Sequence, residues 1–355
     1  MRTLPGLDLE RAGRYLVEAA GGRLTGALRA EVIAGGKSNL TYLVHGESGR
    51  VVVRRPPLGL VLPSAHDMAR EYQVTSALYG AGYPVARPLL LVTDEDVIGA
   101  PFYVMEYVQG VVLRDEAAPV GTAPPASTPA AVTPLASTPL AISAAQARHC
   151  GELLVDALLR LHAIDPAAAG LGRLGRPEGY LSRQVSRWRK QWEASRTREL
   201  PLLDSVADEL ARRVPESPEP AIVHGDYRLD NVMFSTDLSA VAAVMDWEMA
   251  TVGDPLADVG LLVVYTDMPA PRVQPLLPGF PGGPDLARRY AAGSGLPTDR
   301  LDWYVALGAY KLAVICEGIH ARYLRGKTVG AGFERIGETV VPLLELAGQA
   351  LGRKD

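Results

Sequence analysis

The sequence predicts an α+β protein, in which a small antiparallel β part with one inserted helix precedes a larger, mostly helical part. Between residues 28 and 107, short runs of β-branched and aromatic residues alternate with polar ones, which is the pattern of half-buried strands. After residue 143, apolar residues recur instead at helical spacing. A stretch rich in Ala, Pro, Ser and Thr separates the two patterns. We therefore expect three regions, which cover residues 1–110, 111–142 and 143–355.

The first region is expected to form a compact lobe with five strands. Residues 8–20 predict a short amphipathic helix that starts after Asp8. A second helix, inserted among the strands, is expected to have Ser64 as its N-cap and to be ended by Gly80 and Gly82, because Ser caps helices well and Gly ends them. The strands are expected at residues 28–33, 40–44, 51–55, 88–93 and 101–107.

The second and third regions differ sharply in composition. Within residues 115–142 no charge follows Glu116, and the tetrapeptide ASTP occurs twice. Low-complexity composition of this kind is typical of linkers and disordered insertions. The third region opens at Ser143 on the capping box SAAQ, which predicts a helix start. Further helices are expected at residues 180–198, 203–213 and 300–324.

The bulk composition excludes several classes of protein. The 355 residues carry a formal net charge of -4, whereas nucleic-acid-binding domains are usually basic, so no nucleic-acid partner is expected. No run of about 18 apolar residues predicts a membrane span, and the N-terminus lacks the apolar core of a signal peptide. Cys150 and Cys316 lie in apolar, helix-like segments, so we expect two buried thiols in a cytoplasmic protein.

Residues 222–232, IVHGDYRLDNV, concentrate polar chemistry directly after an apolar run. They carry His224, Asp226 and Asn231, and a further apolar run ends at Asp246. Two short strands side by side would bring Asn231 and Asp246 to one edge. Their oxygen atoms suit a hard cation such as Mg²⁺, which keeps several waters and binds phosphate. Asp226 could then orient or deprotonate a hydroxyl, which is the division of roles in phosphoryl transfer.

Six motifs, in this order, resemble one family of kinases. They are GGKSNLTYLV, VVVRRPP, LPSAHDMAREYQV, FYVMEYVQG, HGDYRLDNVMF and MDWEMATVGDPLADVG. The HGD form of the loop, followed by Asn and then DW, resembles the aminoglycoside phosphotransferase-like family of small-molecule kinases, which includes the choline kinase type. Within this family the motifs resemble the kinase-like domains of acyl-CoA dehydrogenase family members 10 and 11. The resemblance covers nearly the whole chain outside residues 115–142.

This resemblance implies a bilobal, protein kinase-like fold and an ATP-dependent phosphotransferase that acts on a hydroxyl of a small molecule. Asp226 would be the catalytic base, and Asn231 and Asp246 would hold Mg²⁺. His224 would brace the catalytic loop, and Asp258 would fix its geometry. The expected partners are therefore a nucleotide and a small hydroxyl-bearing acceptor.

The same resemblance implies nucleotide contacts in the first region. The turn AGGKSN would cover the nucleotide, because glycines let backbone amides approach phosphate closely. The segment MEYV would be the hinge, where backbone groups meet the adenine. The residues expected at the nucleotide in these two segments are Gly35, Gly36, Ser38, Asn39, Glu106 and Val108.

Two departures from the protein-kinase pattern stand out. Kinases place a Lys on the third strand, paired with a helix Glu, whereas this strand reads VVVRR and carries Arg54 there. Arg keeps the charge and binds phosphate in a forked geometry, with a different reach. We expect Glu71 as its partner, and Arg54 rather than Arg55 to face the nucleotide, because successive strand residues point to opposite faces. The second departure is DWE in place of DFG, which implies less regulation by this segment.

Other functions remain open at this stage. The presence of Arg54 allows a non-catalytic, nucleotide-binding pseudokinase. A phosphoesterase could use His224, Asp226 and Asp246 as a metal site. The intact loop residues and the hinge motif favour the kinase over both.

The acceptor is open as well. The resemblance to the acyl-CoA dehydrogenase family members implies a hydroxyacyl-type or other endogenous metabolite. An aminoglycoside, as in a 3'-type antibiotic kinase, is less expected because no acidic run suited to a polycation is evident in the third region. Basic residues in 183–192 could bind the phosphates of a CoA thioester or form a solvated helix face. The last predicted helix carries five residues that could line an acceptor site, although Tyr310 could equally serve packing: Tyr310, Lys311, Glu317, His320 and Arg322.

Overall fold

The computed structural model of the chain describes residues 4–33, 39–58, 67–113, 142–268, 277–326 and 333–352. The chain divides into two units. The first takes in the described residues of Met1–Val111 and Val232–Met249, and the second those of Ser137–Asn231 and Ala250–Asp355. Of the expected linker region, only Val111–Leu113 and Ile142 are described. A segment from the second half of the sequence thus belongs to the N-terminal unit.

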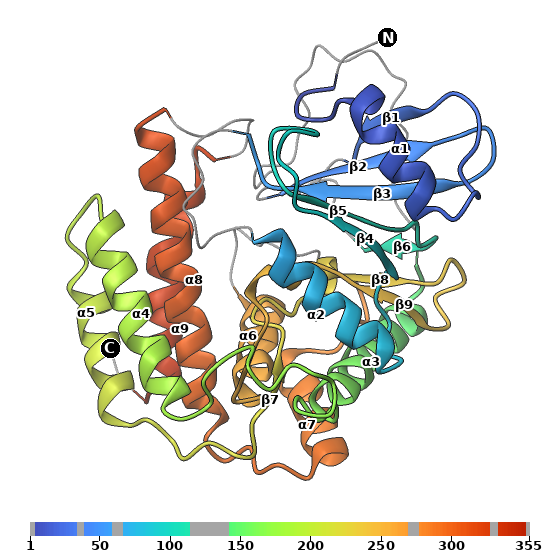
Figure 1. Ribbon diagram of the computed structural model, residues 1–355. Helices are drawn as coiled ribbons and strands as arrows, with labels where there is room; N and C mark the ends of the chain where they lie inside the picture. The colour runs from blue at the N-terminus through green and yellow to red at the C-terminus, as the bar shows by residue number, and fades with distance from the viewer. Residues whose placement is uncertain are drawn as a thin grey trace. The chain divides into compact units, whose positions relative to one another are not determined.

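The first unit is built on the predicted five-stranded antiparallel sheet. Its strands are β1 (Arg29–Val32), β2 (Leu40–His45), β3 (Arg50–Arg55), β4 (Pro88–Val92) and β5 (Phe102–Glu106). They lie in the order β1-β2-β3-β5-β4, and neighbouring strands are antiparallel (Figure 1). Along β3 the side chains alternate between the two faces, so Val53 and Arg55 share one face and Arg54 lies on the other.

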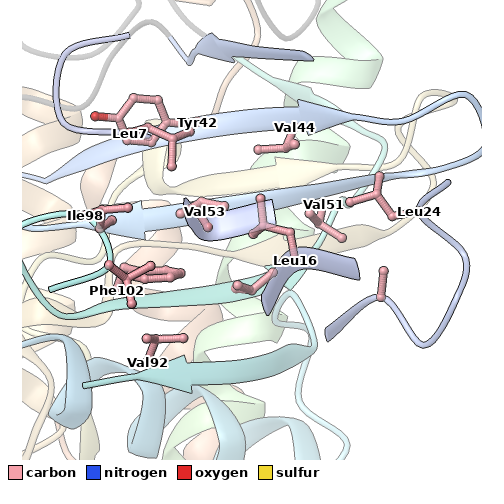
Figure 2. Close-up of a cluster of buried hydrophobic side chains, with 14 residues drawn as sticks. Leu7, Leu16, Leu24, Tyr42, Val44, Val51, Val53, Val92, Ile98 and Phe102 are labelled. Atoms are coloured by element: carbon pink, nitrogen blue, oxygen red, sulfur yellow. The ribbon is translucent and has the colours of Figure 1, made fainter. Parts of the chain in front are cut away.

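One face of this sheet forms the core of the first unit with helix α1 (Leu9–Ala19). The buried side chains of this core include Leu7, Leu16, Leu24, Tyr42, Val44, Val51, Val53, Val92, Ile98 and Phe102 (Figure 2). Asp8 caps α1, because its carboxylate accepts hydrogen bonds from the backbone N–H groups of Glu10 and Arg11. The predicted start of this helix, directly after Asp8, is therefore confirmed.

Helix α2 (Met68–Gly80) contacts β4 and β5 and carries the Glu71 that was expected to meet the third strand. Its N-cap is Asp67, whose carboxylate accepts the N–H of Arg70. The expected cap, Ser64, is therefore wrong, and that residue lies outside the described part of the chain. Ser64 and Asp67, three residues apart, are both good capping residues, and the helix starts after Asp67, which is closer to the apolar stretch.

A three-stranded sheet completes the first unit. Strands β8 (Val232–Phe234) and β9 (Val241–Val244) form an antiparallel hairpin in which Val232 pairs with Val244, and β6 (Val111–Val112) joins the other edge of β8. The expectation of two short strands side by side is confirmed. β6 is too short to leave a period-2 pattern, so the sequence did not predict it.

The second unit consists mainly of helices. These are α3 (Ala144–His162), α4 (Tyr180–Ser195), α5 (Pro201–Arg212), α6 (Leu256–Asp267), α7 (Gly283–Ser294), α8 (Leu301–Leu324) and α9 (Val340–Ala350). Helix α8 contacts α4, α5, α6 and α9, which explains why it is apolar on most sides. The helices predicted at residues 180–198, 203–213 and 300–324 are confirmed, with ends shifted by up to three residues. An antiparallel strand pair, β7 (Ala221–Val223) and β10 (Thr251–Gly253), carries the polar loop.

Two expectations drawn from composition can be compared with the described residues. Cys150 and Cys316 are buried thiols that form no disulfide within the described ranges, as predicted, and burial raises the pKa of Cys150 to about 11. Within the described ranges, no helix combines the length and the apolar character that crossing a membrane requires.

The capping box predicted at the start of α3 is present in the structure. The Ser143 hydroxyl accepts the N–H of Gln146, and the Gln146 side chain accepts the N–H of Ser143, as the sequence predicted. Replacing Ser143 with Ala is expected to lower the free energy of unfolding by about 1 kcal/mol, because helix N–H groups lose their acceptor. Urea unfolding measures this change. Ser186→Ala, at an exposed position inside α4, serves as the control and should cost nothing.

Candidate active site

The loop after β7 is held by a buried carboxylate from a different part of the chain. Asp258, in α6, accepts the backbone N–H of His224 at 2.7 Å and that of Gly225 at 2.8 Å. The imidazole Nε2 of His162 lies 3.3 Å from the same carboxylate. Burial by itself raises the pKa of Asp258, but the two histidines and the amide donors outweigh it and bring the pKa below its ordinary value. The predicted role of Asp258 in fixing this loop agrees with these contacts.

Gly225 and His224 shape the loop that leads to Asp226. Gly225 has a φ of +81°, in the left-handed region that glycine adopts without steric cost. His224 is fully buried, and its Nδ1 lies 3.2 Å from the backbone nitrogen of Asp226, which donates to it. The predicted bracing role of His224 therefore has a specific contact behind it: the imidazole accepts the amide hydrogen of Asp226.

The Asp226 carboxylate is held in place but remains reachable. Its Oδ1 accepts the Tyr265 hydroxyl at 2.6 Å, and its Oδ2 lies 3.2 Å from Nδ2 of Asn231 and 3.6 Å from Nε of Arg228. The side chain is still 23% exposed. Burial raises the pKa of Asp226, yet the nearby Arg228 and Lys311 outweigh this effect, so the net pKa lies below the ordinary value. The group is an oriented, ionised carboxylate at neutral pH.

Asn231 is oriented by the same loop. Its Nδ2 donates to the backbone oxygen of Asp226 at 2.9 Å as well as to the carboxylate. An Asn amide has one nitrogen and one oxygen, so using the nitrogen here leaves Oδ1 as the acceptor available to a ligand. This is the atom that a hard cation would bind.

In the first unit, Arg54 bridges two carboxylates. Its Nε lies 2.9 Å from Glu71, and its Nη2 lies 2.6 Å from Oδ1 of Asp246. The predicted pairing with Glu71 is confirmed. Arg55 points to the opposite face, where it donates to the backbone oxygens of Gly6 and Ile98. Only Arg54 therefore shares a face with the acidic residues.

Asp246 has a strained backbone. Its φ is +68°, which is uncommon for a residue with a side chain, and such outliers often occur at functional sites. Trp247 next to it is buried and donates its indole N–H to the Val244 oxygen at 3.0 Å, which anchors the turn. The Asp246 side chain is 29% exposed, so its carboxylate can accept a ligand in addition to Arg54.

Asn39 and Glu248 complete this acidic cluster. The Asn39 Nδ2 lies 3.4 Å from Glu71 and 3.3 Å from Glu248, while its buried Oδ1 has no hydrogen-bond partner among the described residues. Burial and the neighbouring carboxylates raise the pKa of Glu71, and Arg54 opposes this effect. Three carboxylates thus surround one guanidinium, which leaves an excess of negative charge that favours a further cation.

These donors fit Mg²⁺ better than a metal held wholly by protein. Across the described ranges, no three His, Cys, Asp or Glu side chains are grouped so as to hold a metal ion. Mg²⁺ commonly takes one or two protein oxygens and completes its shell with water and substrate phosphates. Oδ1 of Asn231 and the free oxygen of Asp246 are ligands of the right chemical type.

The other residues expected to contact the nucleotide belong to the glycine-rich turn and the hinge segment. Gly35, Gly36 and Ser38 fall outside the described residues. Glu106 ends β5, where its N–H donates to the Arg87 oxygen at 2.9 Å. Val108, in the irregular segment after β5, is half-buried. The expected contacts of Glu106 and Val108 with adenine stay predictions.

Three groups that hold the loop, either directly or through Asp258, were not assigned this role from the sequence. These are Tyr265 on Asp226, His162 on Asp258, and Lys311, whose Nζ donates to the Gly225 oxygen. Tyr265 and His162 lie in largely apolar helices, so the sequence pattern gave no reason to assign them a role other than packing. Lys311 was suggested only as an acceptor residue. The suggestion that Glu317 lines an acceptor site is wrong, because this buried carboxylate binds Thr197 and Arg198.

The fold and the oriented carboxylate define a protein of the phosphotransferase class. The sequence matches the phosphotransferase enzyme family over residues 29–304, and the chain belongs to this family. A candidate aminoglycoside phosphotransferase from Ralstonia eutropha JMP134 is 31% identical, with a TM-score of 0.78 over 97% of this chain and 98% of that one.

Two other similarities are informative. Acyl-CoA dehydrogenase family member 11 of Rattus norvegicus is 35% identical over 331 residues, which are 90% of this chain but only 39% of that protein. The chain therefore spans about two fifths of this relative. A thermostable mutant of aminoglycoside phosphotransferase APH(4)-Ia, solved with ADP and hygromycin B, has a TM-score of 0.59 at 15% identity, with 96% of this chain and 97% of that chain covered. At that identity the likeness shows a shared fold.

Proposed function

We propose that this protein is an ATP-dependent small-molecule kinase that transfers the γ-phosphoryl group of ATP to a hydroxyl. The observation that carries this proposal is the Asp226 carboxylate, which Tyr265 and Asn231 orient while it stays ionised and partly exposed. A general base needs this combination of fixed direction, charge and access. Membership of the phosphotransferase enzyme family supports the same conclusion.

In the proposed reaction, Asp226 accepts a hydrogen bond from the acceptor hydroxyl and takes its proton as the oxygen attacks the γ-phosphorus. The bond between the γ-phosphorus and the β,γ-bridging oxygen breaks, and ADP leaves. Asp258 and His224 keep the loop in place during this step. Catalysis of phosphoryl transfer rests mostly on such positioning and on electrostatics.

Asn231 and Asp246 are proposed as the protein ligands of Mg²⁺, which would supply charge neutralisation on the phosphates. Support comes from the hairpin register. Val232 pairs with Val244, Asn231 directly precedes Val232, and Asp246 follows Val244 by two residues. The excess negative charge around Asp246 favours a cation as well.

The nucleotide is proposed to contact the first unit through Arg54, Asn39 and the hinge residues Glu106 and Val108. Two polar groups are suitable: the Asn39 oxygen, which has no partner within the described part of the chain, and the forked guanidinium of Arg54. APH(4)-Ia, which shares the fold, was solved with ADP. We assign the phosphate contact to Arg54 because phosphate binds guanidinium in a bidentate manner.

The acceptor is proposed to be a hydroxyacyl thioester rather than an aminoglycoside. On α4, the exposed residues Arg183, Arg187 and Lys190 lie at helical spacing on one face, and none of them forms an ion pair with another described residue. Such a face suits the phosphates of a CoA moiety and opposes a polycation. The name of the rat relative, an acyl-CoA dehydrogenase, points to acyl thioesters as well.

The decisive assay measures ADP release from Mg-ATP against a panel of hydroxyacyl-CoA thioesters, aminoglycosides, choline-like alcohols and sugars. We expect a hydroxyacyl-CoA to stimulate ADP release at least about tenfold over the acceptor-free rate. Stimulation by an aminoglycoside alone would overturn the acceptor assignment. Failure to bind ATP in calorimetry would overturn the kinase assignment itself.

The proposed contact of Arg54 with the nucleotide can be tested by substitution. Arg54→Met is expected to weaken ATP binding about 100-fold, because a hydrogen bond to a charged group contributes about 1.5–3 kcal/mol. Arg54→Lys keeps the charge but not the fork, so a loss of about tenfold is expected. Calorimetric Kd values for ATP test both. Arg29→Met, at an exposed position of strand β1, is the control. Unchanged affinity in Arg54→Met would remove Arg54 from the nucleotide site.

A further inference from the structure

The peptide group that joins Gly225 to Asp226 is held at both of its polar atoms. Its N–H, which belongs to Asp226, donates to Nδ1 of His224 at 3.2 Å. Its carbonyl, which belongs to Gly225, accepts a hydrogen bond from Nζ of Lys311. A peptide plane with both ends bound cannot rotate freely, and its orientation sets the direction in which the Asp226 side chain leaves the backbone.

Lys311 reaches this carbonyl from α8, 86 residues further along the chain. Its ammonium lies 5.5 Å from the centre of the Trp188 ring of α4, within the range of a cation–π interaction. The same side chain lines a small cavity of about 30 Å³ under the loop, together with Gly225 and Asp258. The Lys311 side chain is therefore confined from two helices as well as from the loop.

The charged groups that face Lys311 explain why the ammonium is kept there. Burial lowers the pKa of Lys311, and Arg187 of α4 adds to this effect, while Asp226 and Asp258 oppose it. A lysine in so enclosed a place costs stability unless it is paired. The hydrogen bond from Lys311 gives the peptide plane a second anchor beside the one from His224.

We propose that Lys311 is a positioning residue for the catalytic loop: by holding the Gly225 carbonyl, its ammonium aims the Asp226 carboxylate at the acceptor hydroxyl. This inference rests on the proposed kinase function. Because Lys311 lies in the second unit with Asp226, it should act on the chemical step and leave nucleotide affinity untouched.

The kinetic test removes the ammonium and then restores it. In Lys311→Met and Lys311→Cys, kcat should fall about 100-fold while the KM for ATP stays within about threefold. Treating Lys311→Cys with 2-bromoethylamine places an ammonium at nearly the lysine length, and should restore at least tenfold in kcat. The parent protein, given the same treatment, controls for the buried thiols of Cys150 and Cys316. No recovery in a protein shown by mass spectrometry to be aminoethylated would overturn the proposal, as would a kcat within threefold of the parent in Lys311→Met.

A second measurement needs no substrate. Hydrogen exchange, followed by mass spectrometry on peptides that cover residues 221–232, reports how firmly the loop is held. Lys311→Met should speed exchange there at least about tenfold and leave α3 and α9 unchanged. If exchange in the loop is unchanged, Lys311 does not position it. If the loop loosens but no acceptor gives turnover even in the parent, the proposed function fails while the positioning role stands.

Discussion

Asp226→Asn is expected to lower kcat for acceptor phosphorylation by about 10³-fold, while the Kd for ATP stays within about threefold. Removal of a general base typically costs about 10²-fold to 10⁴-fold. The amide cannot take the proton of the hydroxyl, yet its oxygen can still accept the Tyr265 hydroxyl that Asp226 accepts at 2.6 Å. The new NH₂ group would face Nδ2 of Asn231, but that nitrogen keeps its hydrogen bond to the backbone oxygen of residue 226, so the main effect should be on the chemistry.

Steady-state kinetics with the best acceptor and calorimetry with ATP together check this result. Asp299→Asn introduces the same change at an exposed position that forms no ion pair with another described residue, so kcat should match the parent. A kcat of Asp226→Asn within tenfold of the parent would contradict the assignment of Asp226 as base. The base would then have to be sought among other groups of the second unit.

Asp258→Asn is expected to lower the free energy of unfolding by about 3 kcal/mol. Two backbone N–H groups and His162 converge on the buried carboxylate of Asp258, at distances between 2.7 and 3.3 Å. An amide in its place turns an NH₂ group toward one of these donors, and breaking a buried charged network of this kind typically costs about 3–5 kcal/mol. Chemical unfolding at pH 7 measures the change.

The matched control is Asp156→Asn. Asp156 receives two hydrogen bonds from Arg289, at 2.8 and 2.7 Å, but both side chains are exposed. Exposed pairs contribute about 0–1 kcal/mol, so the same substitution should cost little here. Similar losses in the two variants would show that the buried network around Asp258 adds nothing special.

The effect of Asp258→Asn should also depend on pH. The folded pKa of Asp258 is below its unfolded value, so its contribution is present above the unfolded pKa and is lost as the pH falls through the folded pKa. The difference in stability between parent and variant should be full at pH 7 and should shrink below about pH 4. A difference that grows toward acid would contradict the lowered pKa.

The local elements were well predicted from the sequence. The five strands of the first sheet and the helix that Asp8 caps follow from patterns a few residues long. The predicted start of α2 was wrong because Ser64 and Asp67 are both good N-cap residues, and the sequence pattern does not show which of them caps the helix. The short strands β6 and β10 were not predicted, because two or three residues are too few to show an alternating pattern.

The candidate site likewise combines features that the sequence predicted with contacts that it did not predict. The spacing of Asp226, Asn231 and Asp246 identified the polar loop and its chemistry, because the loop residues are neighbours in sequence. The partners of these residues were not predictable in the same way. Tyr265 is 39 residues from Asp226, Lys311 is 86 residues from Gly225, and Arg54 is 192 residues from Asp246.

By itself, the sequence determined the α+β class, the order of most elements and the position of the polar loop to which the chemistry is assigned as a proposal. All of these depend on neighbouring residues, through side-chain periodicity, capping and the ligand preferences of short motifs. Only the tertiary structure decided which oxygen of Asp226 is bound by Tyr265, that Arg54 also pairs with Asp246, and which lysine holds the loop. These contacts depend on how buried polar groups from distant segments find partners, because leaving them unpaired costs more than any local preference supplies.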